Sequence, residues 1–244
     1  MIGEGAYGKI FISTVGNINV AVKIISKKGK SNEYLEKFLP RELEAASKLK
    51  HDNIINVFDV MESKNSVYIV MELAQGGDLL DKITEEGPLS KEEAQKIFKQ
   101  IVEAVEYMHR QNMAHRDLKL ENILLDSECK VKVTDFGFSK TVQKNELSNT
   151  FCGSAVYTAP EILKGEAYDA FKADVWSLGV ILYGLVYGAL PFQEGSIIQV
   201  VQKTISLPQM KVDKDCEELI ISMLEPEAAK RANLSDILSS KWFN

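Results

Sequence analysis

The sequence predicts an α+β fold of two lobes, with a β-rich first third and a mainly helical remainder. β-Branched and apolar residues dominate residues 9–25 and the two later runs VFDVM and VYIVMEL, whereas helical periodicity begins after Gly76. No flexible linker, repeat or low-complexity tract divides the chain. The two parts are therefore expected to pack closely, with a cleft between them.

The first third is predicted to begin with a hairpin over residues 9–25, because Gly16-Asn17 is a turn signal between two apolar runs. A helix is predicted over residues 41–50. Pro40 lies in its first turn, where the missing N–H of proline costs nothing. Two further strands are expected, at residues 57–61 and 67–73.

The remainder is predicted to be mainly helical. Ser90 and Glu93 form a capping-box pattern before apolar residues spaced for one buried helix face. Two short strands are expected at residues 123–125 and 130–134. Residues 175–192 carry no charge and touch the lower length limit of a membrane span, but glycines and Pro191 interrupt them, so a buried core helix is predicted.

Composition limits the classes of partner. The chain has 244 residues, 45% of them hydrophobic, and a formal net charge of −6. This charge argues against a general attraction to nucleic acid or to anionic membranes, and favours a basic or small cationic partner. Three well-separated cysteines without a C-x-x-C pattern indicate neither a disulfide framework nor a zinc site, and they favour the reducing cytoplasm.

The glycine-rich stretch IGEGAYGKI (residues 2–10) fits several loops. A P-loop would require Ser or Thr where Ile10 stands, and a dinucleotide fingerprint would require a helix after Gly8. A strand is predicted there instead, which favours a hairpin turn that folds over phosphates, as in protein kinases. Taken alone, the glycines could also mark an ordinary turn.

Four motifs carry the strongest functional signal. HRDLKLEN (residues 115–122) matches the kinase catalytic-loop pattern H-R-D-L-x-x-x-N, and VAVK (20–23), DFG (135–137) and APE (159–161) occur in the family's order. The chain thus resembles the protein kinase superfamily across essentially its whole length. The resemblance implies a bilobal kinase fold with a small β-rich N-lobe (about 1–71), a hinge (72–75) and a mainly helical C-lobe (76–244), in which the first strand is truncated.

The resemblance assigns residues to MgATP. Lys23 is implied to contact the α and β phosphates, and Glu42 to hold Lys23 in place, although in isolation they could be a solvated strand lysine and an exposed helix charge. Asp135 and Asn122 are implied to bind Mg²⁺, which prefers oxygen ligands. Asp117 is implied to accept the proton of the substrate hydroxyl, or at least to orient that hydroxyl.

Further implied roles concern charge compensation and adenine. Lys119 is implied to offset charge on the transferred phosphoryl group, and the hinge Glu72-Leu73-Ala74 to bind adenine with its backbone, next to the gatekeeper Met71. In isolation the apolar members of this set would pass for ordinary core. The residues implied to contact ATP are Ile2, Gly3, Glu4, Gly5, Ala6, Tyr7, Gly8, Lys9, Ile10, Ala21, Lys23, Met71, Glu72, Ala74 and Leu124.

Substrate class follows from the same resemblance. Lys119 and Ser154, in DLKLEN and CGSAVYTAPE, are typical of serine/threonine kinases. DFGFSK, FLPRE and TFCGSAVYTAPEIL resemble the calcium/calmodulin-dependent kinase group, and within it the testis-specific serine kinase branch. Asp78 and Glu121 match positions that contact basic residues upstream of the phosphoacceptor, which implies basic protein substrates. Each could equally be a solvated surface charge.

Regulation is expected to act through the activation segment. Arg116 beside Asp117 favours a phosphate as counter-ion, and Thr150 occupies the family's usual site, with Lys140 as a second cation. An upstream activating kinase is therefore an expected partner. Ser148 is the competing phosphoacceptor.

Structural roles are implied for two further positions. Asp174 is expected to anchor the catalytic-loop backbone, and Arg231 to pair with Glu161. Ala46 is smaller than the aliphatic residue that relatives place in a stack with Val57, His115 and Phe136, which predicts weaker packing of the Glu42 helix in its inward position. The alternatives are a pseudokinase scaffold that retains nucleotide binding and a non-catalytic nucleotide-sensing or interaction domain.

Overall fold

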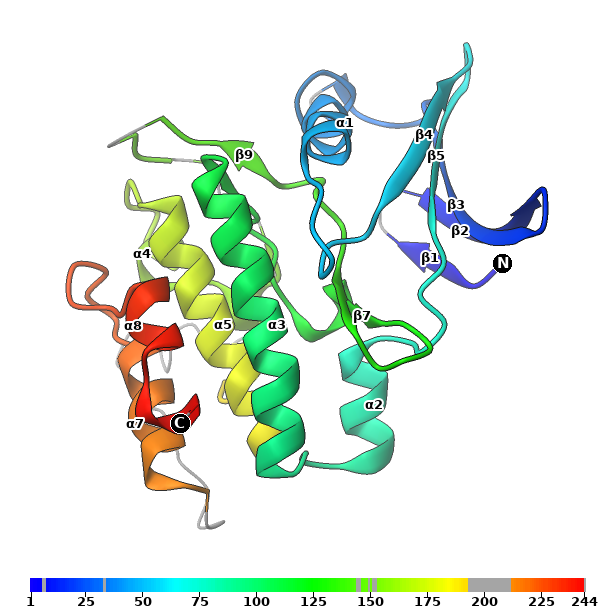
Figure 1. Cartoon of the computed structure of the whole chain (residues 1–244). Helices are drawn as coiled ribbons and strands as arrows, with labels where there is room; N and C mark the ends of the chain where they lie inside the picture. The colour runs from blue at the N-terminus through cyan, green and yellow to red at the C-terminus, as the bar shows by residue number, and fades with distance from the viewer. Residues whose placement is uncertain are drawn as a thin grey trace.

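The structure is a computed structural model, and it describes residues 1–5, 8–32, 34–143, 146–148, 150, 153–192 and 212–243. A five-stranded antiparallel sheet and one helix form the N-terminal lobe, and a helical lobe follows, so the predicted bilobal α+β fold is confirmed (Figure 1). In spatial order the strands of the sheet are β1 (Gly3–Gly5), β2 (Gly8–Val15), β3 (Ile18–Ser26), β5 (Ser66–Glu72) and β4 (Val57–Glu62).

The predicted hairpin is formed by β2 and β3, which pair in register from Lys9↔Ile24 to Val15↔Ile18. Gly16 makes the turn with a φ of +61°, a conformation that glycine adopts without strain. A Cβ on Gly8 would lie 2.7 Å from the backbone oxygen of Ile24, so the close approach of these strands also requires glycine. Strand β1 is short, with three residues paired to β2.

Helix α1 (Leu39–Lys48) follows a π-helical turn at Tyr34–Phe38. It begins and ends two residues earlier than predicted. Pro40 occupies its first turn as expected, and Leu49 ends it by adopting an extended backbone. Beneath α1 lies a small core of the N-terminal lobe, formed by Ile25, Tyr34, Leu39, Val67 and Ile69.

The second lobe is built around two long helices, α3 (Lys91–Arg110) and α5 (Ala170–Tyr187), which Figure 1 shows side by side. Its helices are α2 (Leu79–Glu86), α3 (Lys91–Arg110), α4 (Pro160–Leu163), α5 (Ala170–Tyr187), α7 (Lys214–Met223) and α8 (Leu234–Leu238). Its short strands are β6 (Met113–Ala114), β7 (Ile123–Leu125), β8 (Val131–Val133) and β9 (Lys140–Thr141). Single 3-10 turns occur at Leu120–Asn122, Ala155–Tyr157 and Lys241–Phe243.

The start of α3 differs in one detail from the predicted capping box. The Ser90 hydroxyl accepts a hydrogen bond from the backbone N–H of Glu93, as expected. The Glu93 carboxylate lies 3.1 Å from Lys82 Nζ on α2. This cross-helix ion pair draws the carboxylate toward α2, so half of the predicted box is formed.

The apolar helix α5 is a core helix, as predicted. Within the described part of the chain it alone is long and apolar enough to cross a membrane, and 83% of it is buried inside the fold. A Cβ on Gly179 would lie 2.8 Å from a side-chain carbon of Leu224, so this glycine lets α7 approach α5 closely. Buried on nearly all sides, α5 provides a rigid base for the loops above it.

Candidate active site

The first part of the site is an ion pair between β3 and α1. Lys23 Nζ lies 2.6 Å from a carboxylate oxygen of Glu42 and 3.3 Å from Oδ1 of Asp135. Glu42 stands in the first turn of α1, where helix geometry directs it toward the sheet. The Lys23 and Glu42 side chains are 12% and 6% exposed, so the lysine is a fixed rather than a mobile charge.

The Lys23–Glu42 ion pair also shows how α1 lies relative to the sheet. Ala46 is buried on the same helix, and its small side chain predicts weaker packing there. In this structure the helix nevertheless lies in the inward position, because Glu42 reaches Lys23. Two contacts to the chain after DFG accompany this position: Thr141 donates to Glu44 (3.1 Å), and the Phe38 and Phe138 rings lie edge to face.

The charge state of the pair follows from its surroundings. Burial alone would lower the pKa of Lys23, but the carboxylates of Glu42 and Asp135 outweigh burial and raise this pKa above its ordinary value. Burial likewise works to raise the pKa of Asp135, and the Lys23 ammonium contributes most to the opposing effect, so this pKa lies below its usual range. Both groups are therefore charged at neutral pH.

Asp117 lies in the loop that connects β6 to β7, within a cluster of polar side chains. Its Oδ1 accepts a hydrogen bond from the backbone N–H of Ser154 (3.0 Å), and its Oδ2 lies 3.6 Å from Lys119 Nζ. Asn122 Nδ2 donates to the backbone oxygen of Asp117 (2.8 Å), and Lys119 Nζ donates to the Ser154 hydroxyl (3.1 Å). Burial raises the pKa of Asp117, and the Lys119 ammonium opposes this rise.

The loop that carries Asp117 is anchored from below by Asp174 on α5, as predicted. The two carboxylate oxygens of Asp174 accept hydrogen bonds from the backbone N–H groups of His115 (2.9 Å) and Arg116 (2.8 Å). These bonds hold Arg116 at a φ of +65°, in the left-handed region that few residues adopt. His109 Nε2 lies 2.8 Å from the same carboxylate; burial works to raise the pKa of Asp174, but this contact helps to lower it.

The two predicted metal ligands lie at the ends of a paired strand. β7 pairs with β8, so Asn122 just before β7 and Asp135 just after β8 are brought together, and the Thr134 N–H donates to the Asn122 backbone oxygen (3.0 Å). The Asp135 side chain is 33% exposed. No group of three His, Cys, Asp or Glu side chains with metal-binding geometry occurs among the described residues. The Asp135 carboxylate and the Asn122 amide oxygen are of the ligand type that Mg²⁺ prefers.

The predicted adenine residues also come together. Ala21 on β3 pairs with Met71 on β5, and both belong to the main core. The partly buried side chains that pack against this core include Ile10, Leu73, Ala74 and Leu124. In the glycine-rich stretch, Ile2 precedes β1, Gly3, Glu4 and Gly5 form β1, and Gly8 and Lys9 open β2. Ala6 and Tyr7 lie outside the described residues.

The two acidic residues predicted to contact substrate, Asp78 and Glu121, lie near each other but make different contacts. Asp78 caps α2, accepting a hydrogen bond from the Asp81 N–H (2.9 Å). Burial raises the pKa of Asp78, and the charge of Glu121 adds to this effect. The hydroxyl of Tyr157 lies 3.4 Å from Glu121 Oε2, a contact that no sequence pattern predicts. Ser154 lies directly beside Asp117, as the preceding contacts place it.

The cation next to Asp117 has unused hydrogen-bonding capacity. Arg116 Nε donates to the Phe138 backbone oxygen (2.7 Å), whereas both of its terminal nitrogens are buried and have no hydrogen-bond partner among the described residues. Lys140, the predicted second cation, is instead paired with Glu146 and lies 3.5 Å from the Ser148 hydroxyl. Lys140 as a second cation for a phosphate on Thr150 therefore stays a prediction, in which the phosphate would compete with Glu146.

The two candidate phosphoacceptors differ in exposure. Ser148 is 2% exposed and forms an isolated β-bridge with Tyr168. Thr150 is half-buried, and its backbone oxygen accepts a hydrogen bond from the Tyr168 hydroxyl (2.9 Å). Thr150 is therefore the more accessible of the two hydroxyl-bearing residues.

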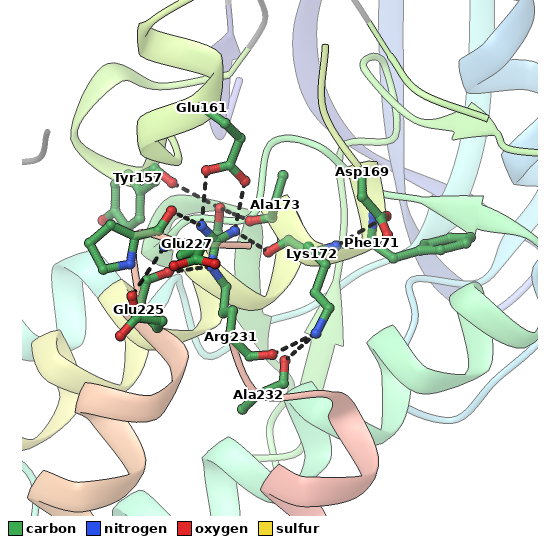
Figure 2. Close-up of polar contacts among 12 residues, drawn as sticks. Tyr157, Glu161, Asp169, Phe171, Lys172, Ala173, Glu225, Glu227, Arg231 and Ala232 are labelled. Atoms are coloured by element: carbon green, nitrogen blue, oxygen red, sulfur yellow. Dashed lines mark hydrogen bonds and ion pairs between the residues drawn. The ribbon is translucent and has the colours of Figure 1, made fainter. Parts of the chain in front are cut away.

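Glu161 of the APE motif forms an ion pair with Arg231, which lies between α7 and α8, as predicted and as Figure 2 shows. Arg231 makes a bidentate contact with Glu161, with N···O distances of 2.8 and 2.9 Å. The guanidinium also donates to the backbone oxygens of Glu225 and Lys172. The Arg231 guanidinium that donates these hydrogen bonds is fully buried. Its contacts therefore fix α4 relative to α5 and to the segment before α8.

Comparisons with known proteins agree with this geometry. Residues 1–243 match the family model for the protein kinase domain. The chain is 43% identical over 263 residues to testis-specific serine/threonine-protein kinase 4 of Homo sapiens, with 99% of this chain and 80% of that protein covered. It is 43% identical over 250 residues to testis-specific serine/threonine-protein kinase 3 of Mus musculus, with 99% and 93% covered.

The resemblance inferred from the HRD, DFG and APE motifs is thereby confirmed, including its testis-specific branch. The chain belongs to the protein kinase family and is a serine/threonine protein kinase.

Proposed function

We propose that this kinase transfers the γ-phosphoryl group of MgATP to serine or threonine in basic protein segments. The observation that carries the proposal is that Glu42 and Asp135 both lie within 3.3 Å of Lys23 Nζ, and that the charge of Asp135 acts on the nearby Asp117. Phosphoryl transfer requires charge neutralisation and alignment more than covalent chemistry, and these groups supply both.

The donor set fits magnesium and phosphate. Asp135 is ionised and partly exposed, and the Nδ2 of Asn122 is committed to Asp117, which leaves its carbonyl oxygen for a metal. Asn122 and Asp135 would hold Mg²⁺, which when bound would offset negative charge on the phosphates. Lys23 adds a fixed ammonium for the phosphates that remain after transfer.

Asp117 is proposed to orient the substrate hydroxyl and to accept its proton. Its Oδ1 is held by the Ser154 N–H, so the carboxylate presents a defined direction to an incoming hydroxyl. The oxygen of that hydroxyl forms the new bond to the γ-phosphorus as the bond to the β-phosphate oxygen breaks. Lys119, which contacts both Asp117 and Ser154, is placed to offset charge during this exchange.

The preference for basic substrates is proposed from Asp78 and Glu121. The charge of Glu121 acts on Asp78, so the two carboxylates lie near each other, Asp78 at the start of α2 and Glu121 in the Leu120–Asn122 turn. A cationic side chain placed between them would relieve their mutual repulsion. The Tyr157 hydroxyl already donates a long hydrogen bond of 3.4 Å to Glu121, so a substrate cation has to compete with this contact.

One experiment tests reaction and preference together. The purified kinase is incubated with labelled MgATP and four peptides that differ only in the acceptor (Ser or Tyr) and in the upstream residues (Arg or Ala). We expect labelling of the serine peptide with upstream Arg, and none by Asp135→Asn. Equal labelling of the Ala and Arg serine peptides would reject the basic preference alone, whereas no labelling of any peptide would reject the proposed reaction.

Activation by phosphorylation of Thr150 is proposed from the environment of Arg116. Two buried guanidinium nitrogens without partners among the described residues are costly unless an anion joins them. A phosphate on the half-buried Thr150 would supply acceptor oxygens, and an upstream kinase would add it.

A further inference from the structure

A groove lies on the second lobe, between the chain that follows α4 and the loop that joins α7 to α8. Its volume is about 610 Å³, which is within the range typical of ligand pockets in proteins. Apolar side chains form much of its surface. These residues are Leu147, Ala167, Tyr168, Pro226 and Ala228.

Carboxylates outnumber ammonium groups around this groove. One lining residue, Lys164, is basic, and five are acidic, namely Glu161, Glu166, Asp169, Glu225 and Glu227. Arg231 offsets the charge of Glu161, and Lys230 offsets that of Glu227. Glu166 is exposed and forms no ion pair with any residue that the structure describes. Three carboxylates thus remain against one ammonium group, and we call this site the acidic groove.

The two walls of the acidic groove are held in place by contacts within the protein. The Arg231 guanidinium joins them, because it contacts the Glu161 carboxylate on one wall and the Glu225 backbone oxygen on the other (Figure 2). The Glu166 N–H donates to the Glu161 backbone oxygen (3.0 Å), which fixes the chain after α4. The groove is therefore preformed, and a ligand does not have to order its walls.

The acidic groove adjoins the activation segment. The backbone of Tyr168 exchanges two hydrogen bonds with that of Ser148 (2.8 and 2.9 Å), and the Tyr168 hydroxyl donates to the Thr150 backbone oxygen. Leu147 is 55% exposed and offers an apolar contact at the rim of the groove. The same segment continues in sequence to Ser154, at the proposed phosphoacceptor site. The groove and that site therefore lie along one segment of the chain.

We infer that the acidic groove binds a basic segment of the protein substrate, remote from the phosphoacceptor. The inference rests on the proposed transfer to basic protein segments. Lys and Arg side chains fit such a groove, because their aliphatic stems pack on apolar walls while their charged ends meet carboxylates. Asp78 and Glu121 lie on other elements, so the groove is a second contact for the same substrate. Two contacts on one molecule raise affinity through the local concentration of the second.

The test compares two peptides that share one serine acceptor segment with upstream Arg. They differ in a tail joined by a long flexible Gly/Ser linker, which carries Arg and Leu in one peptide and Ser and Leu in the other. For the wild type we expect the KM of the Arg-tailed peptide to be roughly three- to tenfold lower, with kcat within about twofold. Added salt should reduce the difference, because it screens exposed charges.

A charge reversal in the acidic groove identifies the site. The Glu166 side chain is exposed and has no hydrogen-bond partner among the described residues, so Glu166→Lys leaves the fold intact. We expect this variant to raise the KM of the Arg-tailed peptide to that of the Ser-tailed peptide, whose own KM stays unchanged. Glu128→Lys is the matched control, because it makes the same change at an exposed residue in the turn between β7 and β8.

Three outcomes would contradict a proposal. Equal KM values for the two peptides in the wild type, or an equal loss in Glu128→Lys, would overturn the inference. Sedimentation of the wild type alone excludes a different occupant, since self-association that Glu166→Lys abolishes would assign the groove to a second copy of the chain and overturn it too. Absence of labelling on both peptides would contradict the proposed phosphoryl transfer instead, so the two failures are distinct.

Discussion

The proposed activation by phosphorylation depends on one residue beside Asp117, namely Arg116. Asp174 fixes the Arg116 backbone in a left-handed conformation. Of the three guanidinium nitrogens of Arg116, Nε donates a hydrogen bond to the Phe138 backbone oxygen. The charge of the remaining nitrogens is buried next to Asp117. A buried cation of this kind is stabilised by an anion, and a carboxylate or a phosphate could serve.

The Thr150 proposal makes a prediction at this scale. Thr150→Ala, or enzymatic dephosphorylation of the wild type, should lower kcat/KM for a peptide by on the order of tenfold or more, because charge-assisted hydrogen bonds from Arg116 are lost. Ser148→Ala is the comparison, since Ser148 is buried. Activity would be measured with one peptide under identical conditions. Full activity in Thr150→Ala would refute the proposal, and a loss confined to Ser148→Ala would move the site to Ser148.

Motif letters predicted the identities of the site residues but not all of their partners. The motifs VAVK, HRDLKLEN and DFG implied a shared site for Lys23, Asp117, Asn122 and Asp135, and these residues lie in one region of the structure. The contacts of Tyr157 with Glu121 and of Lys140 with Glu146 depend on how the activation segment folds back. His109 meets Asp174 across 65 positions of sequence, a contact that no local pattern signals.

At the scale of elements, the sequence predicted whether a segment forms a helix or a strand better than it predicted where that segment begins and ends. The β2–β3 hairpin and the core helix α5 follow from turn residues and from apolar composition, and both are confirmed. Helix α1 starts earlier than predicted because the preceding residues 34–38 already wind helically to bury Tyr34 under the sheet. Burial of an aromatic side chain against the core thus overrides the local sequence signal.

The Glu161–Arg231 contact makes a prediction about these elements. Arg231→Met should lower the free energy of unfolding by about 3–5 kcal/mol, because it leaves the buried Glu161 carboxylate without its counter-charge. Lys230→Met is the control, since Lys230 and Glu227 form an exposed pair next to it. Denaturant unfolding measures both variants. An unfolding free energy for Arg231→Met equal to that of the control would show that this contact does not hold α4 in place.

At the scale of the whole molecule, two lobes bring together residues that are far apart in the chain. The sheet supplies Lys23, α1 supplies Glu42, and the β7–β8 hairpin of the second lobe supplies Asp135. The Glu72 carboxylate also joins the two lobes, because it contacts the Asn56 N–H in the first and Lys132 Nζ in the second. The lobe boundary could be anticipated from the change in periodicity, whereas the contacts of Glu72 could not, because Asn56, Glu72 and Lys132 lie in unrelated sequence patterns.

The central claim is that the charged residues of both lobes surround one MgATP, and calorimetric titration with a non-hydrolysable ATP analogue tests it most directly. We predict one nucleotide bound per chain in the presence of Mg²⁺, with affinity reduced at least about tenfold, or 1.4 kcal/mol, by chelation of the metal or by Asp135→Asn. Equal affinity with and without Mg²⁺, in both the wild type and the variant, would contradict the account.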